Sequence, residues 1–438
     1  MPRYLLVTGR LAAESLRHCL ESIPGAEYEV AVLPISVAAL MTTQFVANHL
    51  PGAQRCDIVM IPGLCQGGLE PIVARAGVEV IRGPGSLKDL PAWFGASGEL
   101  KGYGEHRTKI LAEIVDAHAM SLAEILARAS YFRSSGADII DLGCPVQGAF
   151  PDIERTVDAL KNAGHRVSVD SFNAEDILKA DRAGVDLVLS INSRNMELVP
   201  RLKSKVVVIP DLDQGIESLE RSIARLEELH VPFVIDPILK PAGFGFAESI
   251  GEFIRLRRRY PNSEMLMGIG NITELTDADT TGMNALLAGI VAELGIEYVL
   301  TTEVISWARG AVREFALARQ LMHYAHTHKV LPKHLDDRLI TIKDPPFDTF
   351  TEDELRAMQT QIRDGNFRIF ADRHFIYVFN NKHFIKHTDI QTIFDRLGVK
   401  DSPHAFYLGK ELQKALTAVT LGKRYVQEDE LRWGYLSK

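Results

Sequence analysis

The chain has 438 residues, of which 46% are hydrophobic and 24% are charged, and its formal net charge is −8. This is the composition of an ordinary globular protein with enough length for two or three domains, and the dispersed negative charge argues against nucleic-acid binding. The sequence has no uncharged apolar stretch of membrane-spanning length and no secretory signal pattern, so we expect a soluble cytoplasmic protein whose four cysteines are reduced.

Residues 1–104 are expected to form a Rossmann-like α/β domain. Apolar runs at 4–7, 28–33, 57–61 and 78–81 are typical of strands, and 11–22 and 37–48 of helices. Gly-containing turns follow two of these strands, at 8–10 and 62–68, where an anion could bind at a helix N-terminus. Neither turn has the spacing of a dinucleotide or P-loop motif, so we favour tight turns that need glycine.

Residues 105–332 contain eight apolar runs that stop on polar side chains. The runs span 109–116, 137–143, 167–173, 187–193, 206–211, 233–238, 265–271 and 298–303, and the first carries Glu113. The segments between them are predicted helices at 122–134, 151–163, 174–183, 218–229, 247–260 and 283–294, while 194–205 is too short for a long helix.

Eight such units predict a (β/α)8 barrel, in which the carboxyl ends of the strands meet at one mouth. A doubly wound open sheet is the alternative, but it would collect its ligand at a single switch point. Polar residues at the ends of many runs favour the barrel.

Residues 333–438 are predicted to form an α+β domain of unknown role. Strands are expected at 367–370, 375–379 and 383–385, with a hairpin turn at Asn380 and Asn381, and helices at 389–397 and 406–421. Upstream, His323, His326 and His328 do not match the spacing of zinc ligands, so no metal site is predicted.

Carboxylate and amide side chains end most runs of the predicted barrel, and the binding residues that we predict are Asp141, Asp170, Asn192, Asp211, Asp236 and Asn271. A mouth that is short of Lys, Arg and His is poorly suited to phosphate, and its ligand should present many donors. The 2-amino-4-oxo edge of a pterin offers parallel N–H donors to a carboxylate, and amides can meet the other ring atoms. The same carboxylates could hold Mg²⁺, and composition leaves both ligands open.

Several stretches carry a family resemblance. Ala137–Gly143 (ADIIDLG), Ser168–Ser171 (SVDS) and Asp236–Ile238 (DPI) with Gly243–Phe246 (GFGF) resemble the pterin-binding barrel of dihydropteroate synthase. The stretches 191–193, 236–237 and 268–271 (GIGN) resemble equally the pterin-binding barrel of corrinoid-dependent methyltetrahydrofolate methyltransferases. This likeness covers residues 109–321. It implies that Asp236 accepts from the pterin 2-amino group and N3, that Asn192 and Asp170 meet the far side of the ring, and that Asn271 reaches toward N5.

The whole chain, with a domain at each end, is similar to dihydropteroate-synthase-related proteins of tetrahydromethanopterin pathways. It departs from true synthases because GIGN replaces their Ser-Arg-Lys motif after the seventh strand, and Thr301–Glu303 (TTE) replaces their Arg-x-His at the eighth. Lys240 and Arg194 are candidates to replace the missing positive charge. We therefore predict Asp170, Asn271 and Lys240 as catalytic residues.

Three functions remain open from the sequence. The first is a transferase that joins a dihydropterin to an arylamine in tetrahydromethanopterin biosynthesis. The second is methyl (C1) transfer from pterin N5, which needs a corrinoid partner because the chain has no DxHxxG-type cobalamin motif. The third is a non-catalytic pterin-binding scaffold. A pterin is the expected ligand in each case, with Mg²⁺ as a candidate second ligand and a homodimer or pathway enzymes as candidate partners. No membrane or nucleic-acid partner is expected.

Overall fold

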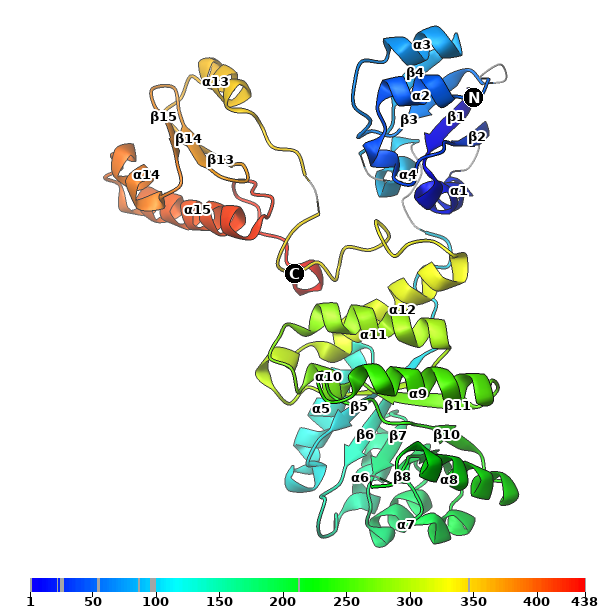
Figure 1. The fold of residues 1–438 in the computed structure, drawn as a ribbon. Coiled ribbons are helices and arrows are strands. Elements are labelled where there is room, and N and C mark those ends of the chain that lie inside the picture. Colours follow the sequence, from blue (N-terminus) through cyan, green and yellow to red (C-terminus); the bar gives the residue numbers. More distant parts are fainter. Residues whose placement is uncertain are drawn as a thin grey trace. The chain divides into compact units, whose positions relative to one another are not determined.

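The computed structural model describes residues 2–21, 23, 27–52, 56–85, 87–94, 100–211, 213–345 and 347–437. The chain forms two compact units, Met1–Leu335 and Asp336–Lys438. The first unit contains an open α/β sheet and a closed barrel, and the second contains a small antiparallel sheet (Figure 1). The domain boundaries after residues 104 and 332 stay predictions.

The N-terminal sheet is parallel, with the strand order β2-β1-β3-β4. Its strands are β1 (Arg3–Thr8), β2 (Glu27–Val32), β3 (Ile58–Ile61) and β4 (Glu79–Arg82), and its helices are α1 (Ala13–Glu21), α2 (Thr43–His49), α3 (Glu70–Ala76) and α4 (Leu90–Trp93). Because side chains alternate along a strand, Leu5 and Val7 pack in one apolar cluster with α2 and α3, while Leu6 packs in another with α1 and α4. The predicted Rossmann-like architecture is confirmed, and helices α3 and α4 are additions to it.

The glycine turns of this domain are packed too tightly for a side chain. A Cβ at Gly9 would lie 2.9 Å from the carbonyl oxygen of Ile35, and one at Gly63 would lie 2.5 Å from that of Gly83. These contacts support the interpretation of both turns as structural. The predicted helix at 37–48 begins only at Thr43, because the Thr42 hydroxyl caps it by accepting from Phe45 N.

Eight parallel strands close into a barrel, which confirms the predicted (β/α)8 fold (Figure 1). The strands are β5 (Lys109–Ile114), β6 (Ile139–Gly143), β7 (Val167–Asp170), β8 (Leu187–Ile191), β9 (Lys205–Val208), β10 (Phe233–Ile235), β11 (Glu264–Gly268) and β12 (Tyr298–Thr301). The helices are α5 (Leu122–Ser135), α6 (Ile153–Asn162), α7 (Ala174–Ala183), α8 (Ile216–Glu228), α9 (Phe246–Arg259), α10 (Gly270–Thr273), α11 (Thr280–Leu294) and α12 (Ala311–His328). The short connection after β8 holds the 3-10 helix Met196–Arg201.

Apolar side chains fill the barrel interior. The inner cluster contains Leu111, Ile139, Leu187, Leu189, Val207, Val234, Leu266 and Tyr298. Since every second residue of a strand points inward, the next inward positions toward the carboxyl ends of β5, β6 and β10 are Glu113, Asp141 and Asp236. The apolar layer thus forms the floor on which these acids stand.

The C-terminal unit is α+β, as predicted. Its antiparallel strands are β13 (Arg368–Ala371), β14 (Ile376–Phe379) and β15 (Phe384–His387), and its helices are α13 (Glu352–Gln361), α14 (Ile390–Leu397) and α15 (Ser402–Leu421). The predicted hairpin turn is closed by Asn380, whose Oδ1 accepts from the backbone N–H groups of Lys382 and His383. Helix α13 was not predicted, although the capping box formed by Thr351 and Glu354 marks its start. Along the described ranges of both units, no helix is long and apolar enough to cross a membrane.

Candidate functional site

Four carboxylates, of which Asp141 is buried and the other three are half-buried, stand above the apolar floor at the carboxyl ends of the barrel strands. Glu113 and Asp141 occupy paired positions on β5 and β6, Asp170 ends β7, and Asp236 follows β10. Asp170 pairs with Gly143, where a Cβ would lie 2.7 Å from Oε1 of Glu113. The glycine therefore leaves room for the Glu113 carboxylate, and we call these four residues the acid cluster.

Hydrogen bonds from neighbouring strands and loops orient three members of the acid cluster. Ser168 Oγ donates to Asp141 Oδ1 at 2.5 Å, and Ser190 Oγ donates to Asp170 Oδ1 at 2.6 Å. The backbone N–H of Ile238 donates to Asp236 Oδ1 at 2.8 Å. Asp141 is fully buried, and its Oδ2 has no hydrogen-bond partner within the described structure.

The backbone is strained at two of these supporting residues. Ser190 has φ 68° and Ile238 has φ 67°, in the left-handed region that costs a non-glycine residue on the order of 1–3 kcal/mol. At Ser190 the strain accompanies a register shift between β8 and β9. Such strain is concentrated at functional sites, and here both residues hold a carboxylate of the acid cluster.

Burial raises the pKa of every carboxyl group in the acid cluster. The pKa of Glu113 rises to about 7, through burial and then through the charges of Asp170, Asp116 and Glu274. Burial raises the pKa of Asp236 to about 7 as well, and it raises the pKa values of Asp141 and Asp170. In the part of the chain that the structure describes, no Lys or Arg forms an ion pair with these four groups. The acid cluster therefore holds protons near neutral pH and can both donate and accept hydrogen bonds.

These pKa values predict how stability depends on pH. Because the folded ligand-free chain binds more protons than the unfolded chain from about pH 4 to pH 7, the acid cluster makes the free energy of unfolding fall as pH rises through this window. In a double variant with Glu113→Gln and Asp236→Asn, these two side chains cannot titrate in either the folded or the unfolded chain. We expect urea unfolding to show wild type losing stability relative to this variant between pH 5 and pH 8. A difference that is constant with pH would contradict the assignment.

The two predicted amides lie after the strands rather than on them. Asn192, next after β8, accepts at Oδ1 from the backbone N–H of Arg194, and Asn271 Nδ2 donates to the carbonyl of Leu239 at 2.7 Å. Asn271 stands in the short helix α10, one residue after a glycine, and not at the end of β11. Its Oδ1 has no partner among the residues that are described. Each amide thus keeps part of its hydrogen-bonding capacity for another molecule.

Asp211 and Lys240 are both engaged by protein partners. Both oxygens of Asp211 accept from the hydroxyl of Ser193, so this carboxylate fastens the loop after β8. Lys240 Nζ donates to Glu248 at 3.1 Å. Arg194 Nη2 lies 3.6 Å from Asp213, and its side chain is 70% exposed. Their roles in a ligand site stay predictions.

Exposed apolar side chains surround the carboxyl ends of the strands. They occupy loops after β6, β7, β10, β11 and β12, and they are Val146, Phe172, Phe244, Leu275 and Val304. The most exposed are Val146 at 90% and Phe244 at 82%. Phe172 and Phe244 follow the acids Asp170 and Asp236 in the chain. An acid cluster surrounded by an apolar rim suits a flat ring that has N–H donors on its edge.

Glu113 is the member of the acid cluster that was not among the predicted binding residues. Its signal was its position inside the first apolar run, three residues before the run ends at Asp116. No group of three or more His, Cys, Asp or Glu residues within the described ranges is arranged to hold a metal ion, including His323, His326 and His328.

The fold and the acid cluster define a (β/α)8-barrel protein with four carboxyl groups gathered at the mouth of the barrel. A family of unknown function, DUF6513, matches residues 3–85. An uncharacterised protein of Methanocaldococcus jannaschii is 27% identical over 526 aligned positions, which cover 98% of this chain and 99% of that relative.

Solved structures of dihydropteroate synthases are similar to about half of the chain. The enzyme of Yersinia pestis, in complex with a pterine-sulfa conjugate, is 18% identical, with a TM-score of 0.41 and coverage of 50% of this chain and 94% of that enzyme. The enzyme of Xanthomonas albilineans, in complex with 7,8-dihydropteroate, is 19% identical, with a TM-score of 0.40 and coverage of 51% and 94%.

Proposed function

We propose that the barrel mouth binds a pterin and that the protein is a transferase of pteridine metabolism. The observation that carries the proposal is the acid cluster itself, where carboxyl groups gather without a cation at the carboxyl ends of the strands. A ligand that brings N–H donors would satisfy the orphan oxygen of Asp141 and stabilise the ionised forms of its neighbours. The motifs that resemble pterin-binding barrels contain three of these acids, Asp141, Asp170 and Asp236.

The proposed pose uses groups that still have hydrogen-bonding capacity. Asp236 accepts from the 2-amino group and N3 of the pterin, since Ile238 N occupies only part of the capacity of Oδ1. Asp170 and Asn192 meet the far side of the ring, and Asn271 approaches N5. The exposed rings of Phe172 and Phe244 supply apolar surface for the flat faces.

Isothermal titration calorimetry with 7,8-dihydropterin and with a tetrahydropterin tests this proposal. We expect micromolar affinity at pH 8 for at least one of the two. Since Asp236 has a pKa of about 7 and must ionise to accept two N–H groups, binding below that pH should release close to one proton. Titrations in buffers of different ionisation enthalpy measure this release. An absence of binding to both ligands would contradict the proposal.

The first reaction that we propose joins a dihydropterin to an arylamine, as a step of tetrahydromethanopterin biosynthesis. The C–O bond to the pyrophosphate group breaks with its electron pair on the leaving group, while the arylamine nitrogen forms the new C–N bond and loses a proton. In this proposal Asp170 takes this proton, Asn271 orients the ring, and Lys240 approaches the leaving group after it separates from Glu248. Pyrophosphate release from dihydropterin pyrophosphate, Mg²⁺ and an arylamine is the expected result, with loss of release in Asp170→Asn.

C1 transfer from pterin N5 is a second candidate, and the raised pKa values favour it. Glu113 holds a proton near neutral pH, and an acid beside N5 can protonate this nitrogen as the methyl group leaves. In addition, Lys240 and Arg194 are paired with Glu248 and Asp213, so the mouth has few cations for a pyrophosphate. Demethylation of a methylated tetrahydropterin in the presence of a corrinoid protein tests this reaction. Binding without either turnover would identify a pterin-binding scaffold.

A further inference from the structure

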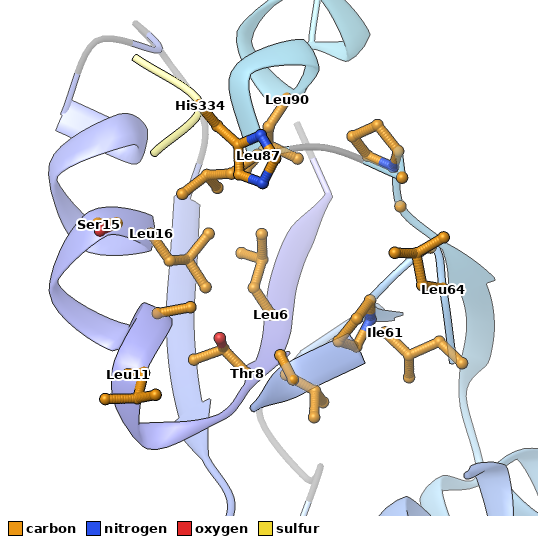
Figure 2. A pocket seen from close by; sticks show the side chains of 18 of the residues that line it. Leu6, Thr8, Leu11, Ser15, Leu16, Ile61, Leu64, Leu87, Leu90 and His334 are labelled. Carbon is orange, nitrogen blue, oxygen red and sulfur yellow. The ribbon is translucent and has the colours of Figure 1, made fainter. Parts of the chain in front are cut away.

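The N-terminal domain contains a cavity of about 330 Å³ that is separate from the barrel mouth (Figure 2). It lies at the carboxyl ends of the central strands, since its lining includes Thr8 at the end of β1, Pro62 and Gly63 after β3, and Gly83 after β4. The strand order β2-β1-β3-β4 reverses direction between β1 and β3. Open α/β sheets bind their ligands at this kind of switch point.

Most of the residues that line this cavity are apolar. Buried leucines and a methionine line its interior, namely Leu6, Leu16, Met60 and Leu90. At the rim, Leu11 and Leu64 expose 57% and 58% of their surface, and Val37 and Leu331 are also exposed. An apolar cleft with a volume of about 300 Å³ or more is typical of a small-molecule site. Exposed apolar side chains around such a cleft indicate a binding surface.

One buried polar group in the cavity has no protein partner. Thr8 is only 4% exposed, and its hydroxyl forms no hydrogen bond within the described parts of the chain. Figure 2 shows its oxygen turned toward the cavity, between Leu6 and Leu11. This oxygen is not one of the fully buried side-chain atoms that lack a partner, so it can be reached from the cavity. A ligand with one donor or acceptor at this position can form a hydrogen bond with it.

The turns around the cavity are unsuited to a phosphate. After β1, the backbone N–H groups of Arg10, Leu11 and Ala12 donate to the carbonyls of Ile35, Ser36 and Gly9. A phosphate would need these N–H groups to be available. The guanidinium of Arg82 is also occupied, by the carbonyls of Cys65 and Gly67. Lys333 and His334 are exposed and lie at the rim of the cavity, whereas the residues of its floor are uncharged.

We propose that this cavity binds a neutral, mainly apolar small molecule, with one hydrogen-bonding group that meets the Thr8 hydroxyl. The chemistry of the walls selects an aromatic or compact aliphatic body, and the occupied N–H groups select against nucleotides. The domain that holds the cavity is the part of the chain matched by the family of unknown function. The proposal is independent of pterin binding, because none of its residues belongs to the barrel mouth.

Saturation-transfer-difference NMR on the full-length protein tests the proposal with indole and benzyl alcohol as probes. Both carry an apolar body and a single hydrogen-bonding group, and we expect millimolar or tighter binding. The substitution Leu64→Ser removes exposed apolar wall and should weaken binding at least about fourfold, the effect of roughly one buried methylene. Thr8→Val keeps the shape but loses the hydroxyl, and it should weaken binding about three- to tenfold.

The matched control is Leu40→Ser, because Leu40 is 72% exposed in the same domain but does not line the cavity. Probe binding should be unchanged in this control and in Asp236→Asn, which separates the cavity from the pterin site. The proposal is overturned if neither probe binds wild type, or if both cavity variants bind like the control. Displacement of indole by AMP at lower concentration than by benzyl alcohol would also overturn it, since the site would then be one for nucleotides.

Discussion

Replacing Asp236 by asparagine is expected to weaken pterin binding at least about a hundredfold. Asparagine has nearly the same shape, but it has one acceptor oxygen and turns an N–H donor toward the donors of the pterin edge. A lost charge-assisted hydrogen bond costs about 1.5–3 kcal/mol, and an unpaired buried donor adds a comparable cost. Since 1.4 kcal/mol is about a factor of ten in affinity, the sum reaches two orders of magnitude.

The matched control for this variant is Asp186→Asn. Asp186 belongs to the same barrel but stands before β8, at the amino end of the strands, where it accepts from Arg166 and from the backbone N–H of Val167. Calorimetry at pH 8 should give this control the affinity of wild type to within about threefold.

The pH dependence of pterin affinity distinguishes a variant that has lost the Asp236 contact from one that has unfolded. Wild-type affinity should rise as pH increases toward the pKa of Asp236, which is about 7, and then level. In Asp236→Asn this contribution to the rise disappears because no proton is released at this position. An Asp236→Asn protein that binds the pterin like wild type would remove Asp236 from the proposed site.

The barrel could be predicted from the sequence because its strands carry two signals at once. Runs such as 187–193 combine β-branched residues with a polar stop, and the stops recur at the spacing of βα units. Asp141, Asp170 and Asp236 could be predicted as neighbours because each stands at or next to the carboxyl end of a strand. In a parallel barrel these ends lie at the same level around one mouth. Glu113 was not predicted because the apolar run continues to Asp116. From the sequence alone, the polar residue at the end of the strand was therefore Asp116, although Glu113 is the one that points into the barrel.

Loop residues were less predictable, since their environment depends on contacts that no local pattern encodes. Asn271 stands in a short helix after Gly270, and the oxygens of Asp211 are occupied by Ser193. The cavity of the N-terminal domain was also missed. Leu6, Leu64 and Leu90 come from a strand and two distant segments, and only the folded sheet brings them together.

A second large effect is expected at the opposite end of the barrel, where Arg319 of α12 is buried. Its guanidinium donates to the carbonyls of Thr108 and Gly136, at 2.8 and 3.0 Å, and forms an ion pair with Asp138. Asp138 also accepts from the backbone N–H of Ile110. One side chain that is 6% exposed therefore fastens the last helix to the amino ends of β5 and β6, which are the first two strands of the barrel.

We expect Arg319→Ala to lower the free energy of unfolding by about 3–5 kcal/mol, because it leaves a partly buried carboxylate and two carbonyl groups without their partner. Urea unfolding of the full-length protein, followed by far-UV circular dichroism, measures the change. Arg225→Ala is the control, since its ion pair with Glu228 is exposed and should contribute at most about 1 kcal/mol. Equal losses in the two variants would contradict this account of Arg319.

The same variant also tests whether the two ends of the barrel are independent. Arg319 contacts residues at the amino ends of the strands, whereas the acid cluster stands at their carboxyl ends, with the apolar floor between them. Under conditions where Arg319→Ala remains folded, its affinity for a pterin should therefore match that of wild type within about threefold. A large loss of affinity without unfolding would mean that the position of α12 is coupled to the acid cluster through the packed interior of the barrel.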